Sequence, residues 1–202
     1  MSFKKVHDIQ PESFEFNKEN LNLADNILKK YPTDKKKSAV MPLLYLAQSQ
    51  NDNWLPLAAL KYIGKFLSMP YINVYEIATF YTMYNLAPVG KYFVQVCTTS
   101  PCLLRGADEI VKVCKNKISE KENIVTKDGL CSWTEVECLG ACVNSPMIQV
   151  NKDYYEDLNK DNMEKIIESL IQDKPLKPGS YRSRKSSAPE KFENKNNGAQ
   201  NA

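Results

Sequence analysis

The periodicity of apolar residues changes near residue 88, and this change constrains the fold more than any other feature of the chain. Before it, apolar residues recur at intervals of three and four, as they do along one face of an α-helix. Asn17, followed by Lys18 and Glu19, is a suitable N-cap for the first helix. The expected helices lie around Ala24–Tyr31, Val40–Ala47, Pro56–Leu67 and Val74–Phe80. The first part of the chain is therefore predicted to be a small helical bundle.

After the turn residues Pro88-Val-Gly90, short runs rich in β-branched and aromatic residues are typical of strands. Expected strands are 91–97, 124–125, 133–137, 147–150 and 154–155, with Asn151–Asp153 as a hairpin turn. Helical periodicity returns at 107–114 and 163–170. The predicted fold is α+β: a helical bundle, then an α/β sandwich with a mixed sheet.

Three segments follow from these patterns: a helical domain (1–88), an α/β domain (89–173) and a C-terminal tail (174–202). The tail holds seven Lys and Arg against two Glu, so its net charge is +5, while the whole chain has only +3. Few apolar residues and several Pro, Ser and Asn predict that this tail is solvated and disordered.

Several function classes are disfavoured by the sequence. No run reaches the about 18 apolar residues of a membrane helix, so direct membrane insertion is not expected. The N-terminus resembles neither a secretory signal nor a transit peptide, which favours a cytoplasmic, bacterial product or a mature chain. The excess of positive charge lies in the tail, so nucleic-acid binding is not expected. No phosphate-binding glycine motif is present, and His7, in a polar stretch, is expected to be solvated. No catalytic residues are predicted.

Six cysteines in a chain without an export signal indicate metal or redox chemistry rather than disulfides. Four form two close pairs, Cys97 with Cys102 (C-x4-C) and Cys138 with Cys142 (C-x3-C), each following a predicted strand. Their loops are short and rich in small residues, so backbone N–H groups can approach the sulfur atoms. The remaining two cysteines are interpreted as small apolar residues that pack in the core: Cys114 and Cys131.

Spacing alone leaves three interpretations of the four paired cysteines. A [2Fe–2S] centre takes four thiolates at wide and varied spacing. Structural zinc is best known from C-x2-C pairs. Buried or disulfide-bonded cysteines without a metal are the third. The spacing favours the iron–sulfur cluster.

Three motifs make the chain similar to a known family: Cys97-Thr-Thr-Ser-Pro-Cys102, Val136-Glu-Cys-Leu-Gly-Ala-Cys-Val-Asn-Ser-Pro-Met147 and Val74-Tyr-Glu-Ile-Ala-Thr-Phe-Tyr-Thr-Met83. They closely resemble the thioredoxin-like [2Fe–2S] subunit (the 24 kDa subunit) of NADH:quinone oxidoreductase, respiratory complex I. The likeness covers roughly residues 12–180. Small departures, such as Ser100 and Ser145, leave the ligand set intact, whereas the tail after about Arg182 lies outside the family pattern.

This resemblance implies a thioredoxin-like α/β domain with one [2Fe–2S] cluster, whose ligands are Cys97, Cys102, Cys138 and Cys142. It implies a subunit of NADH dehydrogenase that transfers electrons in the respiratory chain. NADH and FMN belong to a partner flavoprotein, which performs the hydride chemistry. The resemblance also implies that the chain is peripheral, attached through the complex on the cytoplasmic or matrix side of the inner membrane.

Two alternatives remain open beside this function. One is the equivalent small subunit of an NAD-linked hydrogenase or formate dehydrogenase, which has a similar sequence. The other is a zinc-stabilised interaction module without redox activity.

Near a reduced cluster, Arg105 and nearby backbone amides are expected to favour reduction, and Glu135 and Glu137 to oppose it.

Overall fold

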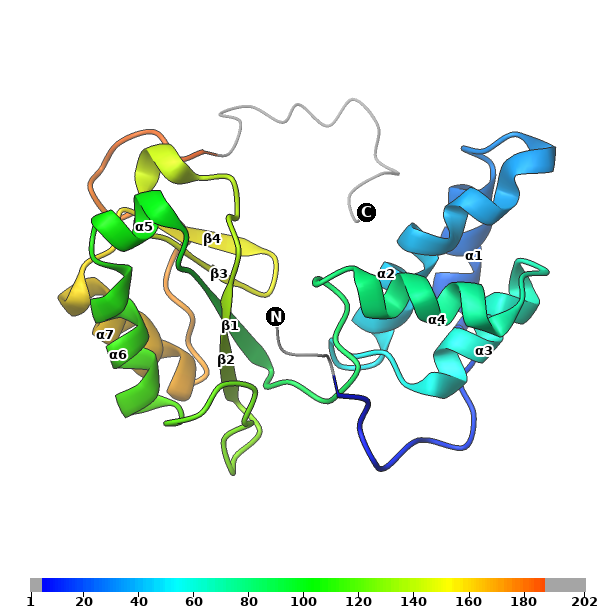
Figure 1. The fold of residues 1–202 in the computed structure, drawn as a ribbon, viewed down its shortest axis with the longest axis horizontal. Helices are drawn as coiled ribbons and strands as arrows, with labels where there is room; N and C mark the ends of the chain where they lie inside the picture. The colour runs from blue at the N-terminus through cyan, green and yellow to red at the C-terminus, as the bar shows by residue number, and fades with distance from the viewer. Residues whose placement is uncertain (1–4, 188–202) are drawn as a thin grey trace. The chain divides into compact units, whose positions relative to one another are not determined.

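The computed structural model describes residues 5–187 and divides the chain into two compact units, one ending at Pro88 and the other beginning at Val89 (Figure 1). The remainder of the expected tail, residues 188–202, lies outside the described residues. Each unit has its own cluster of buried apolar side chains. Among residues 5–187, no helix combines the length and the apolar character needed to cross a bilayer.

The first unit is helical, as predicted. Its elements are α1 (Lys18–Leu28), the 3-10 helix η1 (Thr33–Ala39), α2 (Val40–Gln50), α3 (Leu57–Phe66) and α4 (Tyr71–Phe80). Asn17 caps α1, because its side-chain oxygen accepts a hydrogen bond from the backbone N–H of Asn20 at 2.8 Å. α4 begins three residues earlier than predicted, directly after Pro70. The apolar pattern did not indicate the first turn of α4, because Ile72 in that turn is 55% exposed and does not continue the buried stripe.

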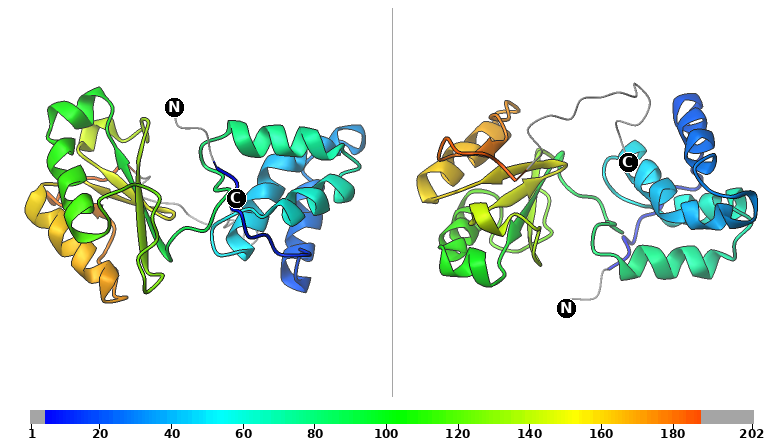
Figure 2. Two further views of the ribbon diagram at one scale, coloured as in Figure 1. Left: turned by 60° about the horizontal axis from the view of Figure 1, so that its bottom comes forward. Right: turned by 90° about the horizontal axis from the view of Figure 1, so that it is seen from above.

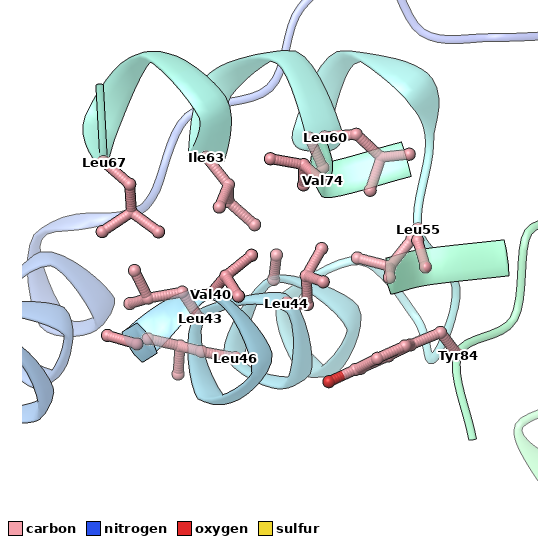
Figure 3. Close-up of a cluster of buried hydrophobic side chains, with 14 of the residues drawn as sticks. Val40, Leu43, Leu44, Leu46, Leu55, Leu60, Ile63, Leu67, Val74 and Tyr84 are labelled. Atoms are coloured by element: carbon pink, nitrogen blue, oxygen red, sulfur yellow. The ribbon is translucent and has the colours of Figure 1, made fainter. Parts of the chain in front are cut away.

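The core of the helical unit lies between α2, α3 and α4, where side chains from the three helices face one another (Figure 3). Tyr84 closes this core and donates a hydrogen bond through its hydroxyl to the carbonyl of Met41 at 2.9 Å. The aromatic run that ends at Tyr84 is divided by burial. Phe80 and Tyr81 are exposed, by 78% and 38%, so only Tyr84 of the three belongs to the core.

The second unit is built on a five-stranded mixed sheet of order β2-β1-β3-β4-β5. Its strands are β1 (Tyr92–Cys97), β2 (Cys131–Val136), β3 (Ile148–Val150), β4 (Asp153–Glu156) and β5 (Gly179–Ser180). β1 runs parallel to β2 and antiparallel to β3, and β3 and β4 form the expected hairpin. The mixed sheet and the α+β class are therefore as predicted.

Helices α6 (Ala107–Lys117) and α7 (Lys160–Ile171) cover one face of this sheet, as all the views show (Figures 1 and 2). Because side chains alternate across a strand, Val94 and Val96 of β1 and Trp133 of β2 point to the same face. All three are fully buried in one cluster with residues of both helices.

A short α-helix, a short strand and the 3-10 helices were not predicted, and one predicted strand is absent. α5 (Ser100–Leu104) has only five residues, and β5 has two, so neither carries a usable period. The segment 124–125 is not a strand, because Ile124 is 50% exposed and the chain there forms turns that precede β2. β2 instead begins at Cys131, earlier than expected.

The structure also differs from the prediction that the chain is disordered from residue 174. Gly179 and Ser180 form β5 and pair with β4, and the hydroxyl of Tyr155 donates to the carbonyl of Leu176 at 2.9 Å. Arg184 forms an ion pair with the buried Asp157. Composition did not indicate this order because it comes from polar contacts with the sheet rather than from an apolar core.

Candidate metal centre

The ends of the parallel strands β1 and β2 bring the two cysteine loops together. Cys97 is the last residue of β1, and the sheet register places it opposite Val136, the last residue of β2. Cys138 follows two residues later. The backbone N–H of Cys97 also donates to the carbonyl of Met147, at 3.3 Å, just before β3. The first cysteine is therefore held between the two segments that flank the second loop.

The first pair is buried. Cys97 and Cys102 are each 1% exposed, and Cys102 lies on α5, which begins directly after the loop residue Thr99. The hydroxyl of Thr99 lies 3.4 Å from the sulfur of Cys97. The short helix thus turns the backbone so that the sulfur of Cys102 reaches that of Cys97.

The second pair is accessible. Cys138 is exposed and Cys142 is partly exposed, and their sulfur atoms lie 3.4 Å apart. The backbone N–H of Gly140 points to the sulfur of Cys138 at 3.4 Å. Gly140 has a φ of +84°, a conformation that side chains with a Cβ rarely adopt, so the tight turn between the cysteines requires glycine.

The pKa values of the paired cysteines depend on groups of both loops. Burial tends to raise the pKa of Cys97, but hydrogen bonds from the Thr99 hydroxyl and from the backbone N–H groups of Leu139 and Thr99 lower it overall. Burial and the neighbouring Cys97 raise the pKa of Cys102 to about 12. The hydrogen bond with Cys138 raises the pKa of Cys142, with a smaller contribution from Cys97. The Leu139 N–H at Cys97 places the second loop against the first pair.

The four sulfur atoms are arranged as two pairs rather than as one compact set. In residues 5–187, no three His, Cys, Asp or Glu side chains converge on a position for a single metal ion. A tetrahedral metal with metal–sulfur bonds of about 2.3 Å separates its sulfurs by about 3.8 Å, so each close pair suits one metal. This arrangement fits a binuclear centre better than a lone zinc ion.

The surroundings of the pairs offer hydrogen-bond donors that a sulfur-rich centre can use. Ser145, three residues after Cys142, is 1% exposed, and its hydroxyl has no hydrogen-bond partner among the described residues. Its backbone N–H donates to the carbonyl of Cys142. An unused buried donor beside the second pair, together with the amides of Gly140 and Leu139, fits an anionic cluster.

The other two cysteines lie in the apolar core, as predicted. Cys114 on α6 and Cys131 at the start of β2 are fully buried in the cluster beneath the helices. Burial raises the pKa of Cys131 to about 11, so this thiol stays protonated and unreactive at neutral pH. Neither is positioned with the two pairs.

The remaining residues singled out in the sequence lie on the surface or in the first unit. Arg105, Glu135 and Glu137 are exposed. His7 belongs to the helical unit, where its half-buried ring packs edge-on against Trp54. The hydroxyl of Thr99 was not predicted to contact the cluster ligands, although a hydroxyl two residues after a cysteine at a strand end is a recognisable signal.

Three exposed apolar residues near the cysteines, Leu103, Leu104 and Val143, were also not predicted, and they are called the rim below. Leu103 and Leu104 on α5 are 48% and 87% exposed, and Val143, next to Cys142, is 76% exposed. All three lie within two residues of a paired cysteine in sequence. Their periodicity could not distinguish them from core residues, because α5 and the 3-10 helix η2 (Cys142–Asn144) are each shorter than two helical turns.

Comparison with known proteins agrees with this geometry. The sequence profile of the thioredoxin-like [2Fe-2S] ferredoxin family matches residues 24–171. The chain belongs to this family. The cofactor that characterises the family is a [2Fe–2S] cluster, and the match includes all four paired cysteines.

Curated relatives within the family are named as one subunit of NADH-quinone oxidoreductase. The subunit from Rickettsia typhi is 56% identical over 161 residues, which cover 80% of this chain and 95% of that protein. Its counterpart from Rhizobium meliloti is 46% identical over 194 residues, covering 94% of this chain and 70% of that protein. This thioredoxin-like ferredoxin is therefore similar to the oxidoreductase subunit over most of its length.

A solved structure supports the fold alone. The NAD+-reducing [NiFe]-hydrogenase in its H2-reduced state superimposes with a TM-score of 0.57 at 18% identity. The superposition covers 66% of this chain but only 23% of the matched hydrogenase polypeptide. The α+β arrangement of this ferredoxin thus occurs as part of a larger redox enzyme.

Proposed function

We propose that this chain is the electron-transfer subunit of an NADH–quinone oxidoreductase, with one [2Fe–2S] cluster bound by Cys97, Cys102, Cys138 and Cys142. The observation that supports the proposal is the arrangement of the four cysteines as two close pairs in the loops that follow the parallel strands β1 and β2. Bound there, the cluster supplies a site that accepts and releases one electron at a time.

The chain's own residues create the environment of this electron. Two thiolates come from the buried pair and two from the accessible pair, so one side of the centre is shielded and the other faces outward. The N–H groups of Leu139 and Gly140 and the hydroxyl of Thr99 donate toward sulfur, which offsets negative charge. These donors make reduction easier than it would be in an apolar pocket.

The exposed rim of Leu103, Leu104 and Val143 flanks the cysteines of both pairs in sequence. Apolar side chains of this size, on a surface beside a redox centre, suit a partner protein that excludes water there. The proposed partner is the flavoprotein subunit that holds FMN and NADH and performs the hydride chemistry. The assembly lies in the peripheral arm of the complex, on the cytoplasmic side of a bacterial membrane.

The alternative, a small subunit of an NAD-linked hydrogenase or formate dehydrogenase, has weaker support. Identity to the hydrogenase is 18%, against 56% to the oxidoreductase subunit of Rickettsia typhi. The fold suits both complexes, so only the partners of the chain distinguish them.

The test is to purify the chain from its native host under anaerobic conditions together with its bound partners. We expect iron and acid-labile sulfide at about two atoms each per chain, and an EPR signal of a [2Fe–2S] centre after reduction. Co-purifying proteins should include a flavoprotein that oxidises NADH. Zinc in place of iron, or a hydrogenase subunit among the partners, would contradict the proposal.

A further inference from the structure

Two adjacent carboxylates are buried at the end of β4. Glu156 and Asp157 are each 1% exposed, although carboxylates are rarely buried unless they are paired. The backbone N–H of Asp157 donates to the carbonyl of Asn144 at 2.7 Å. Asn144 is the last residue of η2, which begins with Cys142, so the buried carboxylates adjoin the second cysteine loop.

Each carboxylate has hydrogen-bond donors in the C-terminal segment 179–187. The guanidinium of Arg184 donates to both oxygens of Asp157, through Nε at 2.8 Å and through a second nitrogen. The hydroxyl of Ser180 donates to Asp157 at 2.5 Å. Ser187 donates to Glu156 through its backbone N–H, at 3.0 Å, and through its hydroxyl. The Arg184 guanidinium keeps the pKa of Asp157 below its ordinary value, so this carboxylate is charged at neutral pH.

The same segment also contacts η2, the 3-10 helix that begins with Cys142. Arg184 donates to the carbonyl of Val143, the residue after Cys142, at 2.8 Å. The side-chain amide of Asn144 donates to the carbonyl of Lys185 at 2.9 Å and to Glu156 at 2.6 Å. One guanidinium therefore bridges a buried carboxylate and the backbone of the loop, a geometry that suits the planar, multidentate head of arginine.

We infer that residues 179–187 form a strap that holds η2 and, through it, the Cys138–Cys142 loop in place, with Arg184 as the positioning residue. The family profile ends at residue 171, so the strap lies outside the segment that it describes. The backbone N–H groups of Asp157 and Leu158 also donate to the carbonyls of Asn144 and Pro146, in the segment after Cys142. The strap adds a second attachment, which slows the opening of the loop and the release of the cluster. This inference rests on the proposed cluster ligands.

The experiment compares Arg184→Ala with wild type and with Arg182→Ala in the full-length, cluster-loaded chain. Arg182 is exposed, and its removal changes the charge of the same segment without breaking a contact to the loop. An iron chelator is added, and loss of visible absorbance gives the rate of cluster release. We expect roughly tenfold faster release from Arg184→Ala and an unchanged rate from Arg182→Ala, the scale usual for groups that orient metal ligands.

Hydrogen exchange of the cluster-free chain provides a readout that does not depend on the cluster. Arg184→Ala should speed the exchange of amides 138–145 while those of α6 and α7 stay protected. Arg184→Lys retains the charge, but one ammonium group cannot donate to Asp157 and Val143 at once. The cluster should therefore be released at a rate between those of wild type and Arg184→Ala. This variant tests the strap if the alanine variant fails to fold. Wild-type release rates in both Arg184 variants would overturn the strap. A protein that binds no cluster at all would instead overturn the proposed function.

Discussion

At the residue scale, the four paired cysteines differ in exposure, and Cys138 is the most accessible of them. Its sulfur contacts Gly140 and Cys142, which belong to its own loop. Cys138→Ala should therefore remove a ligand without disturbing either core. We expect iron content to fall roughly tenfold or more, since the cluster needs four thiolates.

Iron analysis and EPR of the purified variant measure this effect, and circular dichroism shows that helix content is kept. The matched control is Cys114→Ala, which alters a fully buried thiol on α6. This control should retain its cluster and lose about 1 kcal/mol of unfolding free energy from the cavity. Equal iron in both variants would exclude Cys138 as a ligand.

Arg105 tests the charge near the proposed cluster. It is exposed at the end of α5, and its backbone N–H donates to the carbonyl of Cys102 at 3.2 Å. Arg105→Gln removes a positive charge that favours the reduced state, so the midpoint potential should fall. An exposed charge about 10 Å away in water contributes only about 0.4 kcal/mol, or about 20 mV for one electron.

A redox titration followed by EPR measures this shift. Lys127→Gln is the control, because Lys127 is also exposed but lies in the loop that precedes β2. It should leave the potential unchanged within a few millivolts. A potential that does not move in Arg105→Gln would show that solvent screens this charge completely.

At the element scale, the helices with clear apolar stripes and the β3–β4 hairpin could be predicted, because each carries a local signal. The N-cap at Asn17 is the plainest example. α5 and β5 could not, since five and two residues show no period. That the two cysteine loops follow neighbouring strands could be predicted from the strand pattern. The partners of Asp157 could not, because they come from a distant segment and leave no local signal. The ligand set itself stays a prediction.

Gly90 shows how one residue limits the pairing of β1 with β2. A Cβ at this position would lie 2.4 Å from the carbonyl carbon of Cys131. The backbone N–H of Gly90 donates to the hydroxyl of Ser132 at 2.8 Å. Gly90→Ala must push the strands apart where their pairing begins. We expect a loss of about 1–3 kcal/mol in unfolding free energy.

Urea denaturation measures this loss. The control is Gly64→Ala on α3, where the added Cβ would lie 3.1 Å from the carbonyl oxygen of Met69. Alanine favours a helix over glycine by about 1 kcal/mol, which offsets that tight contact, so the net change should be small. Equal stability of Gly90→Ala and wild type would mean that the strands adjust without cost.

At the scale of the whole molecule, the polar surface of the α/β unit is interrupted beside the cysteine pairs. Leu104, the most exposed leucine of the rim, follows Cys102 by two residues, and Val143 follows Cys142 directly. Such a rim is unfavourable in water, so we expect it to be buried against the proposed partner. The cluster and the docking surface would then coincide, which shortens the path of the electron.

Leu104→Glu tests this coincidence, because a charge on the rim must be desolvated when the partner binds. With purified flavoprotein subunit, we expect binding to weaken by about 5–30-fold, the range of a central interface residue. Reduction of the cluster by NADH through the partner should slow, while direct reduction by dithionite stays as fast as in wild type. Ile124→Glu is the control, since Ile124 is 50% exposed in the loop before β2. If both variants bind as wild type does, the partner docks elsewhere and the rim has another use. If both weaken equally, the effect is general charge rather than contact at the cysteine pairs.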